Sequence, residues 1–401
     1  MPLDLTSFAA ALKSYYVRDF MENLVYKNNP ALALLPKMEE FYGANMPIPL
    51  VHGNPMGRSA TFSTAQANKD NSRLKAFTLT RAKDYSLASI DNETLEASQN
   101  DKGAFMEAAT VEIDGAIQSA TRSLATALFR DGTGAIGRIN ATVTGTTLTL
   151  ATTVDIVNFE VGMKINFTGD LSATRAGGPL TVNSIDRSAG SMVVSANLNT
   201  ITGLTSNDYI FVQGDLNGKI KGFEAWLPAT VTSTSFFGVD RTADSTRLGG
   251  CRYDGSAQPL EESLLDGLSF VEREGGSPSH GFLNFANLSN LKKALGSKVQ
   301  YVDVNVPNAS VKFSFKGVMI DGNKMPVTII GDQNCPSLVS YLIQLDSWKL
   351  YSLGMAPRIL DSDGLKFLRE SSADSVEVRV GYYGQLGCKA PGWNCRVTLA
   401  S

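Results

Sequence analysis

The sequence is poor in the side chains that most often carry out catalysis or bind metal ions. Its 401 residues include two histidines and four cysteines. His52 and His280 each precede a glycine, and no G-x-S-x-G nucleophile motif lies near either of them. The cysteines fit no zinc-binding spacing, and no histidine lies close to them. They are Cys251, Cys335, Cys388 and Cys395. We therefore expect no catalytic residue, no metal site, no cofactor and no enzyme, with a hydrolase of unfamiliar pattern as an alternative.

Long apolar stretches and a surplus of basic charge are also missing. No run approaches the roughly 20 apolar residues that cross a bilayer, and the start Met1-Pro2-Leu3-Asp4 lacks the pattern of a signal peptide. We expect no membrane association and folding in a cytoplasm, where the cysteines would be reduced. Cys388 and Cys395 could still pair after release into an oxidising medium. The net charge of −3 argues against a dedicated nucleic-acid binder, although a container for nucleic acid needs no basic surplus.

Three short motifs have ordinary structural explanations. Gly132-Thr133-Gly134-Ala135-Ile136-Gly137 has the G-x-G-x-x-G spacing, but it follows a predicted helix and precedes β-rich sequence, so the strand–helix context of a dinucleotide site is absent. We interpret it as a joint. Glu261 and Glu262 open a predicted helix, where acidic side chains complement the dipole. Asp361-Ser362-Asp363-Gly364 begins like a calcium loop but lacks the remaining ligands.

The first third of the chain predicts helices and one exposed hairpin. Helical spacing marks residues 5–27, and the prolines beyond them suggest an arm that runs extended along a surface. Alternation over Arg58–Thr64 and Leu74–Ile90, with a polar turn between, predicts a long β-hairpin that is marginal alone. Residues Leu95–Phe129 carry one apolar stripe and predict a helix about 45 Å long.

The sequence from Gly137 to Asp215 is rich in Thr, Val and Gly and thin in charge, which predicts a small inserted all-β barrel. Its expected strands are Ala141–Val143, Thr147–Ala151, Lys164–Thr168, Leu180–Ile185, Met192–Ala196 and Tyr209–Gln213.

The rest of the chain predicts an α+β region. Helices are expected over 260–273 and Leu288–Leu295. Strands are expected over 281–286, Val299–Val306, Val311–Ile320, Met325–Ile330, Leu338–Leu345, Val376–Tyr383 and Arg396–Leu399, the last two joined through a Gly/Pro turn.

This order of elements resembles the major capsid proteins of tailed bacteriophages with the Hong-Kong-97-like fold. The stretch Gly322-Asn323-Lys324-Met325-Pro326-Val327, then Cys335-Pro336, Ile343-Gln344-Leu345-Asp346 and Trp348, is similar to the axial-domain strands of many members. The resemblance implies an N-terminal arm (1–50), an extended-loop hairpin (51–92), a peripheral domain with a spine helix (93–136), an inserted β-barrel-like domain (137–215), a return to the peripheral domain (216–258), an axial domain (259–369) and peripheral C-terminal strands (370–401).

The resemblance also implies a function. We expect a structural protein that assembles with copies of itself into the hexamers and pentamers of an icosahedral virion head, built in the host cytoplasm, which encloses double-stranded DNA. A portal and a cement protein are further expected partners. Because the arm begins almost at once, we expect that a scaffolding segment has been removed or that scaffolding is a separate protein. The alternatives are the shell of an encapsulin-like nanocompartment and a β-rich adhesin.

Charge predicts how neighbouring subunits would meet. The hairpin region carries basic side chains opposed by Asp70 alone: Arg58, Lys69, Arg73, Lys75, Arg81 and Lys83. From Gly103 to Thr121 the predicted long helix carries only acidic charges: Glu107, Glu112 and Asp114. In the family that the chain resembles, the extended loop lies across the neighbouring peripheral domain. We therefore expect the basic hairpin to dock on the acidic helix of the next subunit, with a merely solvated hairpin as the alternative.

Overall fold

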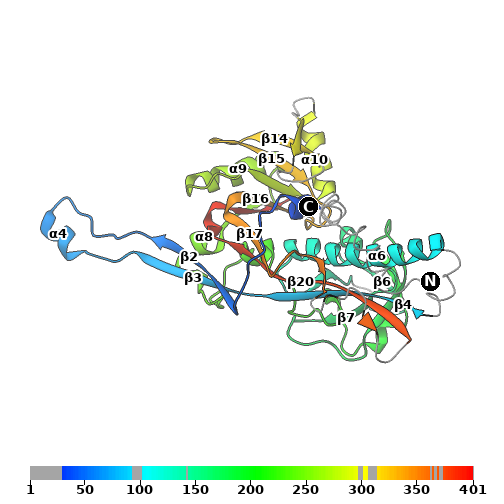
Figure 1. Ribbon diagram of the computed structural model, residues 1–401. Coiled ribbons are helices and arrows are strands. Elements are labelled where there is room, and N and C mark those ends of the chain that lie inside the picture. The colour runs from blue at the N-terminus through cyan, green and yellow to red at the C-terminus, as the bar shows by residue number, and fades with distance from the viewer. Residues whose placement is uncertain are drawn as a thin grey trace.

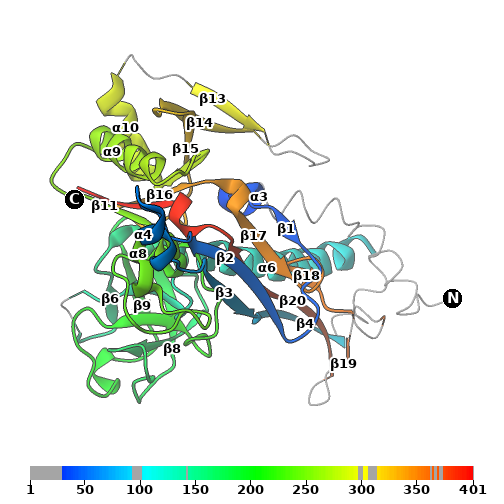
Figure 2. The same cartoon turned by 90° about the vertical axis from the view of Figure 1, so that its left-hand side faces the viewer.

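The computed structural model of the chain describes residues 29–92, 102–140, 143–296, 301–305, 314–361, 364, 368–369 and 374–400, without the side chains of 91, 102–112, 301–305 and 314–316. The helix predicted over residues 5–27 lies outside these ranges. Figures 1 and 2 show three parts from top to bottom: a seven-stranded sheet with two helices, a six-stranded sheet with one long helix, and a barrel. A hairpin projects from the body.

The six-stranded sheet is built around the long strand β20 (Ser375–Cys388). This strand pairs antiparallel with β4 (Ala82–Asp91) and, at successive positions, with three short strands. These are β17 (Trp348–Ser352), β18 (Arg358–Ile359) and β19 (Leu368–Arg369). Helix α6 (Lys102–Phe129) packs on β4 and β20 and ends at the residue that the sequence predicts. Its buried side chains recur at helical spacing, which is why the stripe could be recognised. They include Ile113, Ile117, Ala120, Leu124 and Leu128.

Aromatic side chains fill the core beside this sheet. Trp226 lies in the short helix α7 (Phe223–Trp226), which the sequence patterns do not reveal, and its ring contacts Phe77 at 4.9 Å between centroids. The indole Nε1 donates to the carbonyl oxygen of Leu386 at 3.0 Å, so this large side chain is buried with its donor satisfied. Phe223 and Trp348 extend the cluster, with ring centroids 4.9 Å apart.

The seven-stranded sheet has the order β11-β21-β16-β12-β15-β14-β13. Its strands are β11 (Cys251–Gly255), β12 (His280–Leu283), β13 (Tyr301–Asn305), β14 (Ser314–Asp321), β15 (Pro326–Gly331), β16 (Val339–Ile343) and β21 (Cys395–Leu399). Helices α9 (Leu260–Arg273) and α10 (Phe285–Leu295) pack against it. The buried carboxylate of Glu272 in α9 accepts from the backbone N–H groups of Asn323 and Lys324 at 3.1 and 3.0 Å, which fixes the turn between β14 and β15.

The third sheet has the order β5-β10-β7-β8-β9-β6. Its strands are β5 (Ala135–Arg138), β6 (Thr147–Thr149), β7 (Lys164–Thr168), β8 (Leu180–Asp186), β9 (Ser191–Val194) and β10 (Tyr209–Val212). A bridge between Ile139 and Leu150 joins its two edges, so the sheet closes into a barrel. The apolar core of the barrel consists of its own residues alone, from Ile139 to Ile210. Strand β5 begins two positions before the predicted boundary, within the glycine-rich stretch interpreted as a joint.

Short helical turns complete the described chain. They are α3 (Pro30–Leu34), α4 (Phe62–Ala67), η1 (Thr153–Asn158), η2 (Leu198–Thr200), η3 (Arg241–Asp244), α8 (Ser245–Gly249), η5 (Leu345–Ser347) and η6 (Pro391–Trp393).

The segment that begins at residue 29 is not the surface arm that its prolines suggest. Helix α3 begins with a proline, which suits the first turn of a helix, and Ala31 and Leu32 are buried. The backbone N–H of Ala31 donates to Oδ2 of the buried Asp332 at 3.1 Å, although 301 positions separate the two. Strand β1 (Lys37–Met38) then pairs with β17. Residues 30–38 thus pack against the body of their own chain, whereas the arm expected over 1–50 as a whole stays a prediction.

The hairpin is real but has a different first strand. It pairs β2 (Asn45–Gly53) with β3 (Arg73–Thr80), and the long second strand predicted there is two strands, β3 and β4. Residues Arg58–Thr64, predicted as a strand, form loop and the start of α4 at the tip.

The last two strands do not stay together. Strand β20 belongs to the six-stranded sheet, whereas β21 pairs with β16 and β11 in the seven-stranded sheet. Within the expected axial segment 259–369, β17 and β18 likewise pair with β20 in the six-stranded sheet. The expected division into axial (259–369) and peripheral (370–401) segments stays a prediction.

Candidate assembly interface

The hairpin of β2 and β3 is anchored at its base and extends away from the body (Figure 1). Ile48, Phe77 and Leu79 are buried at the base and belong to the main apolar core. A Cβ atom at Gly387 of β20 would lie 2.7 Å from Cδ1 of Ile48, so glycine there lets the hairpin base lie close on the sheet. Beyond Leu50 and Lys75 almost every hairpin residue is exposed. Since a two-stranded ribbon is marginal alone in water, its outer half needs another surface.

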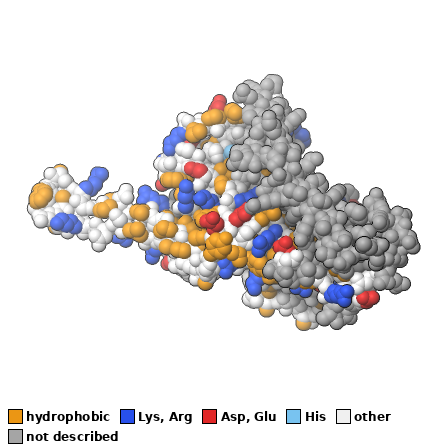
Figure 3. Space-filling model, in the orientation of Figure 1, with side chains coloured by type: hydrophobic (Ala, Val, Ile, Leu, Met, Phe, Trp, Pro, Cys, Tyr) orange, Lys and Arg blue, Asp and Glu red, His pale blue; other side chains and the backbone are white. Residues whose placement is uncertain are grey.

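The two faces of the hairpin differ in chemistry. Side chains alternate between the faces of a strand, so Arg73 and Lys75 share the face of the buried Phe77. We call the opposite face the apolar face. It consists of Pro47, Pro49, Val51, Leu74 and Ala76, all of which are exposed and none charged. The register pairs Pro49 with Ala76 and Val51 with Leu74, so these side chains form one stripe, and apolar side chains run along the hairpin in Figure 3. At the tip, Phe62 is 81% exposed.

The six basic residues predicted for the interface fall into two groups. Arg58, Lys69, Arg73 and Lys75 are exposed on the hairpin, where Arg73 pairs with Asp70 at 3.0 Å. The hydrogen bond from Arg73 lowers the pKa of Asp70.

The other two basic residues lie at the body. The Nη1 of Arg81 donates to the carbonyl oxygen of Phe41 at 2.6 Å, and its guanidinium lies 5.1 Å from the centre of the Phe41 ring. Arg81 therefore stabilises its own subunit. Lys83 is exposed on β4.

The predicted acidic partners lie on α6. Glu107 and Glu112 lie in the helix, with side chains outside those described. Asp114 is half-buried and already has an interaction within the chain. The pairing of the basic and acidic sets stays a prediction about two subunits.

A second exposed face lies on the six-stranded sheet. Along β4 the side chains of Lys83, Tyr85 and Leu87 point to solvent, and Ala88 faces the core. Tyr85 packs edge-on against Tyr383 of β20, with ring centroids 6.0 Å apart. Exposed apolar side chains thus occur on the body as well as on the hairpin. Sequence alternation alone does not show which apolar strand residues will be exposed and which will be buried.

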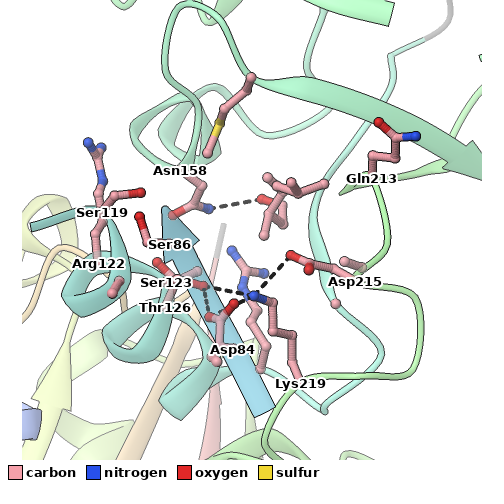
Figure 4. A pocket seen from close by; sticks show the side chains of 18 of the residues that line it. Asp84, Ser86, Ser119, Arg122, Ser123, Thr126, Asn158, Gln213, Asp215 and Lys219 are labelled. Carbon is pink, nitrogen blue, oxygen red and sulfur yellow. Dashed lines mark hydrogen bonds and ion pairs between the residues drawn. The ribbon is translucent and has the colours of Figure 1, made fainter. Parts of the chain in front are cut away.

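The barrel joins the body through polar contacts. At its root Lys219 Nζ lies 2.7 Å from Asp84 Oδ2 and 3.0 Å from Asp215 Oδ2, and it donates to Ser123 Oγ (Figure 4). These groups line a cavity of about 230 Å³ between α6, β4 and the barrel. Burial raises the pKa of Asp215 in spite of Lys219.

Two arginines make further polar contacts between the end of α6 and the barrel. Arg130, which follows α6, pairs with Asp155 of η1 at 2.8 Å. Arg122 of α6 pairs with Glu160 and also donates to the carbonyl oxygen of Val157. The barrel thus contacts the body through polar groups, while its apolar core contains barrel residues.

A solved phage capsid structure shares this architecture. No protein-family model and no curated protein matches the chain. A chain of the cyanophage A-1(L) capsid asymmetric unit matches with a TM-score of 0.52 and 12% identity, over 95% of this chain and 95% of its own. This chain has the fold of that capsid protein. Weaker matches include a capsid of an empty GTA particle, with a TM-score of 0.46 and 8% identity over 98% of each chain. The SrpI encapsulin of Synechococcus elongatus matches with a TM-score of 0.44 and 9% identity, over 97% and 94%.

The glycines, histidines and cysteines to which the sequence analysis assigned no catalytic role have defined structural surroundings. Gly132 and Gly134 adopt positive φ between α6 and β5, and a Cβ at Gly134 would lie 2.4 Å from the carbonyl oxygen of Asp215. His52 is buried near the outer end of β2, where its carbonyl oxygen accepts from Arg247 at 2.8 Å, and burial lowers the pKa of His280 to about 4. All four cysteines are buried and free. Among the described residues there is no cluster of His, Cys, Asp and Glu suited to a metal ion, and no helix long and apolar enough to cross a membrane.

Proposed function

We propose that the chain is the major capsid protein of a tailed bacteriophage, a structural subunit that assembles into hexamers and pentamers of an icosahedral head around double-stranded DNA. The observation that carries this proposal is the shared fold with the cyanophage capsid chain over 95% of both chains. Such a protein acts in the virion after assembly in the host cytoplasm. A separate scaffolding protein, a portal and a cement protein are its expected partners in infected cells.

The projecting hairpin supports the proposal physically. A closed shell needs heterologous contacts between many copies. Apart from the buried His52, whose carbonyl oxygen accepts from Arg247 at 2.8 Å, the outer half of the hairpin is largely exposed, and so is its apolar face. In the assembled shell this hairpin corresponds to the extended loop of the Hong-Kong-97-like fold, α6 to its spine helix, and the seven-stranded sheet to the axial domain. The barrel corresponds to an inserted domain.

Charge then orients the contact between neighbours. Arg58, Lys69, Arg73 and Lys75 of the hairpin would meet the acidic side of α6 in the next subunit, at Glu107, Glu112 and Asp114. Exposed pairs are individually worth under about 1 kcal/mol, but every subunit of the shell repeats them. Complementary charge sets orientation and register more than affinity.

The experiment compares the full chain with a variant in which residues 54–72 are replaced by Asn-Gly, a two-residue turn that closes a hairpin. The full chain is expected to sediment as shell-sized particles, and the variant as folded, unassembled subunits with the same far-ultraviolet circular dichroism. If both sediment as small species, the chain is not a shell protein. Particles from infected cells should protect long double-stranded DNA from nuclease, whereas a copurified enzyme inside them would identify a nanocompartment shell instead.

A further inference from the structure

The outer edge of β2 carries two prolines in a specific register. Strand β2 pairs with β3 and with no other strand among the described residues. In an antiparallel pair, residues opposite each other point both of their backbone polar groups either toward the partner or away from it. The N–H of Thr78 donates to the carbonyl oxygen of Phe237 at 2.9 Å, away from β2. Its opposite residue, Pro47, therefore faces outward as well.

Pro49 lies two positions further on and has the same orientation, since it is opposite Ala76. Proline has no N–H group, so between Asn45 and Val51 this edge presents only the carbonyl oxygens of Pro47 and Pro49. Both prolines are exposed, so neither is required by packing. A strand that added here would leave two of its carbonyl oxygens without donors. Each missing hydrogen bond would destabilise the added strand, because a polar group shielded from water would be left without a partner.

The opposite edge of the hairpin base is already occupied. Besides the bond from Thr78, the carbonyl oxygen of Thr80 accepts from Nε2 of Gln385 at 3.2 Å. Both edges of the base are therefore closed, one by contacts with the body and the other by prolines.

We propose that Pro47 and Pro49 close the outer edge of β2 to strand addition by another copy of this chain. An exposed two-stranded ribbon is a template for edge-to-edge pairing, and copies of this chain would meet at high local concentration during assembly. The prolines keep two ribbons from joining through this edge. That copies meet in a shell rests on the proposed function, whereas closure of the edge does not.

The test uses the unassembled fraction of the full-length chain with Pro47→Val and Pro49→Val together. The matched control is Pro55→Val, an exposed proline in the same hairpin but outside its strands. A second double variant, Pro47→Ala with Pro49→Ala, restores both N–H groups without adding a β-branched side chain. Circular dichroism and thermal melting establish that each variant is folded.

Both double variants are expected to self-associate as concentration rises, with an intermolecular β-sheet band in the infrared spectrum and slower hydrogen exchange along β2. Wild type and Pro55→Val should show neither change. If the folded double variants match Pro55→Val in size distribution and exchange, the prolines do not protect the edge. Because these readouts do not require shells, failure of the capsid proposal would be seen separately in the sedimentation experiment.

Discussion

Val51 and Leu74 lie opposite each other across the hairpin, and both remain more than half exposed, at 56% and 62%. A directly opposite apolar pair stabilises a sheet modestly, but this one lies where the ribbon has no layer beneath it. The pair therefore marks the surface on which the proposed contact between subunits depends.

Replacing this pair by Val51→Ser and Leu74→Ser should leave the subunit folded and stop shell formation. The free energy of unfolding should change by no more than about 0.5 kcal/mol per site, because both side chains are exposed. The matched control is Val161→Ser, an equally exposed apolar residue on the barrel. Sedimentation measures assembly, and normal shells from the double variant would show that the apolar face is not a contact.

Reversing charge on the other face tests orientation. Arg73→Glu with Lys75→Glu should leave a stable subunit that assembles poorly, since both side chains are exposed on the hairpin. Adding Glu107→Lys and Asp114→Lys should restore part of the assembly. Normal particles from the double reversal in moderate salt would contradict docking on the acidic helix.

Arg81 should behave differently from these two residues. Arg81→Glu removes the bond to the carbonyl oxygen of Phe41 and the contact with its ring, so it should lower the free energy of unfolding by about 1–3 kcal/mol. Denaturant unfolding of the subunit measures the loss. Unchanged stability with failed assembly would return Arg81 to the set of contact residues.

The barrel should be removable. Its two ends already touch, because Gly134 lies against Asp215, and its apolar core contains only barrel residues. Replacing residues 135–214 with a short Gly/Ser linker should leave a remainder that melts cooperatively and retains the pair between Lys219 and Asp84. Loss of cooperative melting would show that the barrel belongs to the main core.

Lys219 should be the most sensitive residue at the barrel root. Lys219→Met would leave the partly buried carboxylates of Asp84 and Asp215 without their cation, which should cost about 1–3 kcal/mol. The exposed Lys164→Met on β7 is the control and should be neutral. Urea unfolding curves compare the two, and equal stabilities would mean that water compensates the carboxylates.

Acid should weaken the fold through His280. Burial lowers its pKa from 6.5 to about 4, so the unfolded chain binds more protons between these values and stability falls as pH drops from 6.5 to 4. The loss is on the order of 3 kcal/mol at most. His280→Gln should flatten the stability profile across this window. A profile identical to that of wild type would assign the acid sensitivity to other groups.

Local patterns in the sequence suffice where the structure is locally determined. The limits of β7 and α9 match the predicted ones because alternation and a continuous apolar stripe are properties of neighbouring residues. The strand Asn45–Gly53 could not be recognised in this way, since two prolines lower strand propensity. They are accommodated only because they face the free edge of the hairpin.

Tertiary partners far along the chain explain the other differences. Nothing in the local sequence distinguishes Arg81 from Lys75. Only the fold does so, because it places Phe41, 40 positions away, beside Arg81. The run after Pro30 is buried in the main apolar core, where Asp332, 301 positions away, accepts from Ala31. The basic residues of the proposed interface could be recognised in the sequence. The apolar face could not, because it depends on the register of β2 with β3 and on which hairpin side chains stay exposed.

Electron microscopy of the purified full-length chain tests the central claim most directly. Concentrated protein is expected to form closed icosahedral particles or flat hexameric sheets, with the hairpin of each subunit lying across its neighbour. A uniform population of monomers or small discrete oligomers, at every concentration and with all residues present, would contradict a shell-forming function.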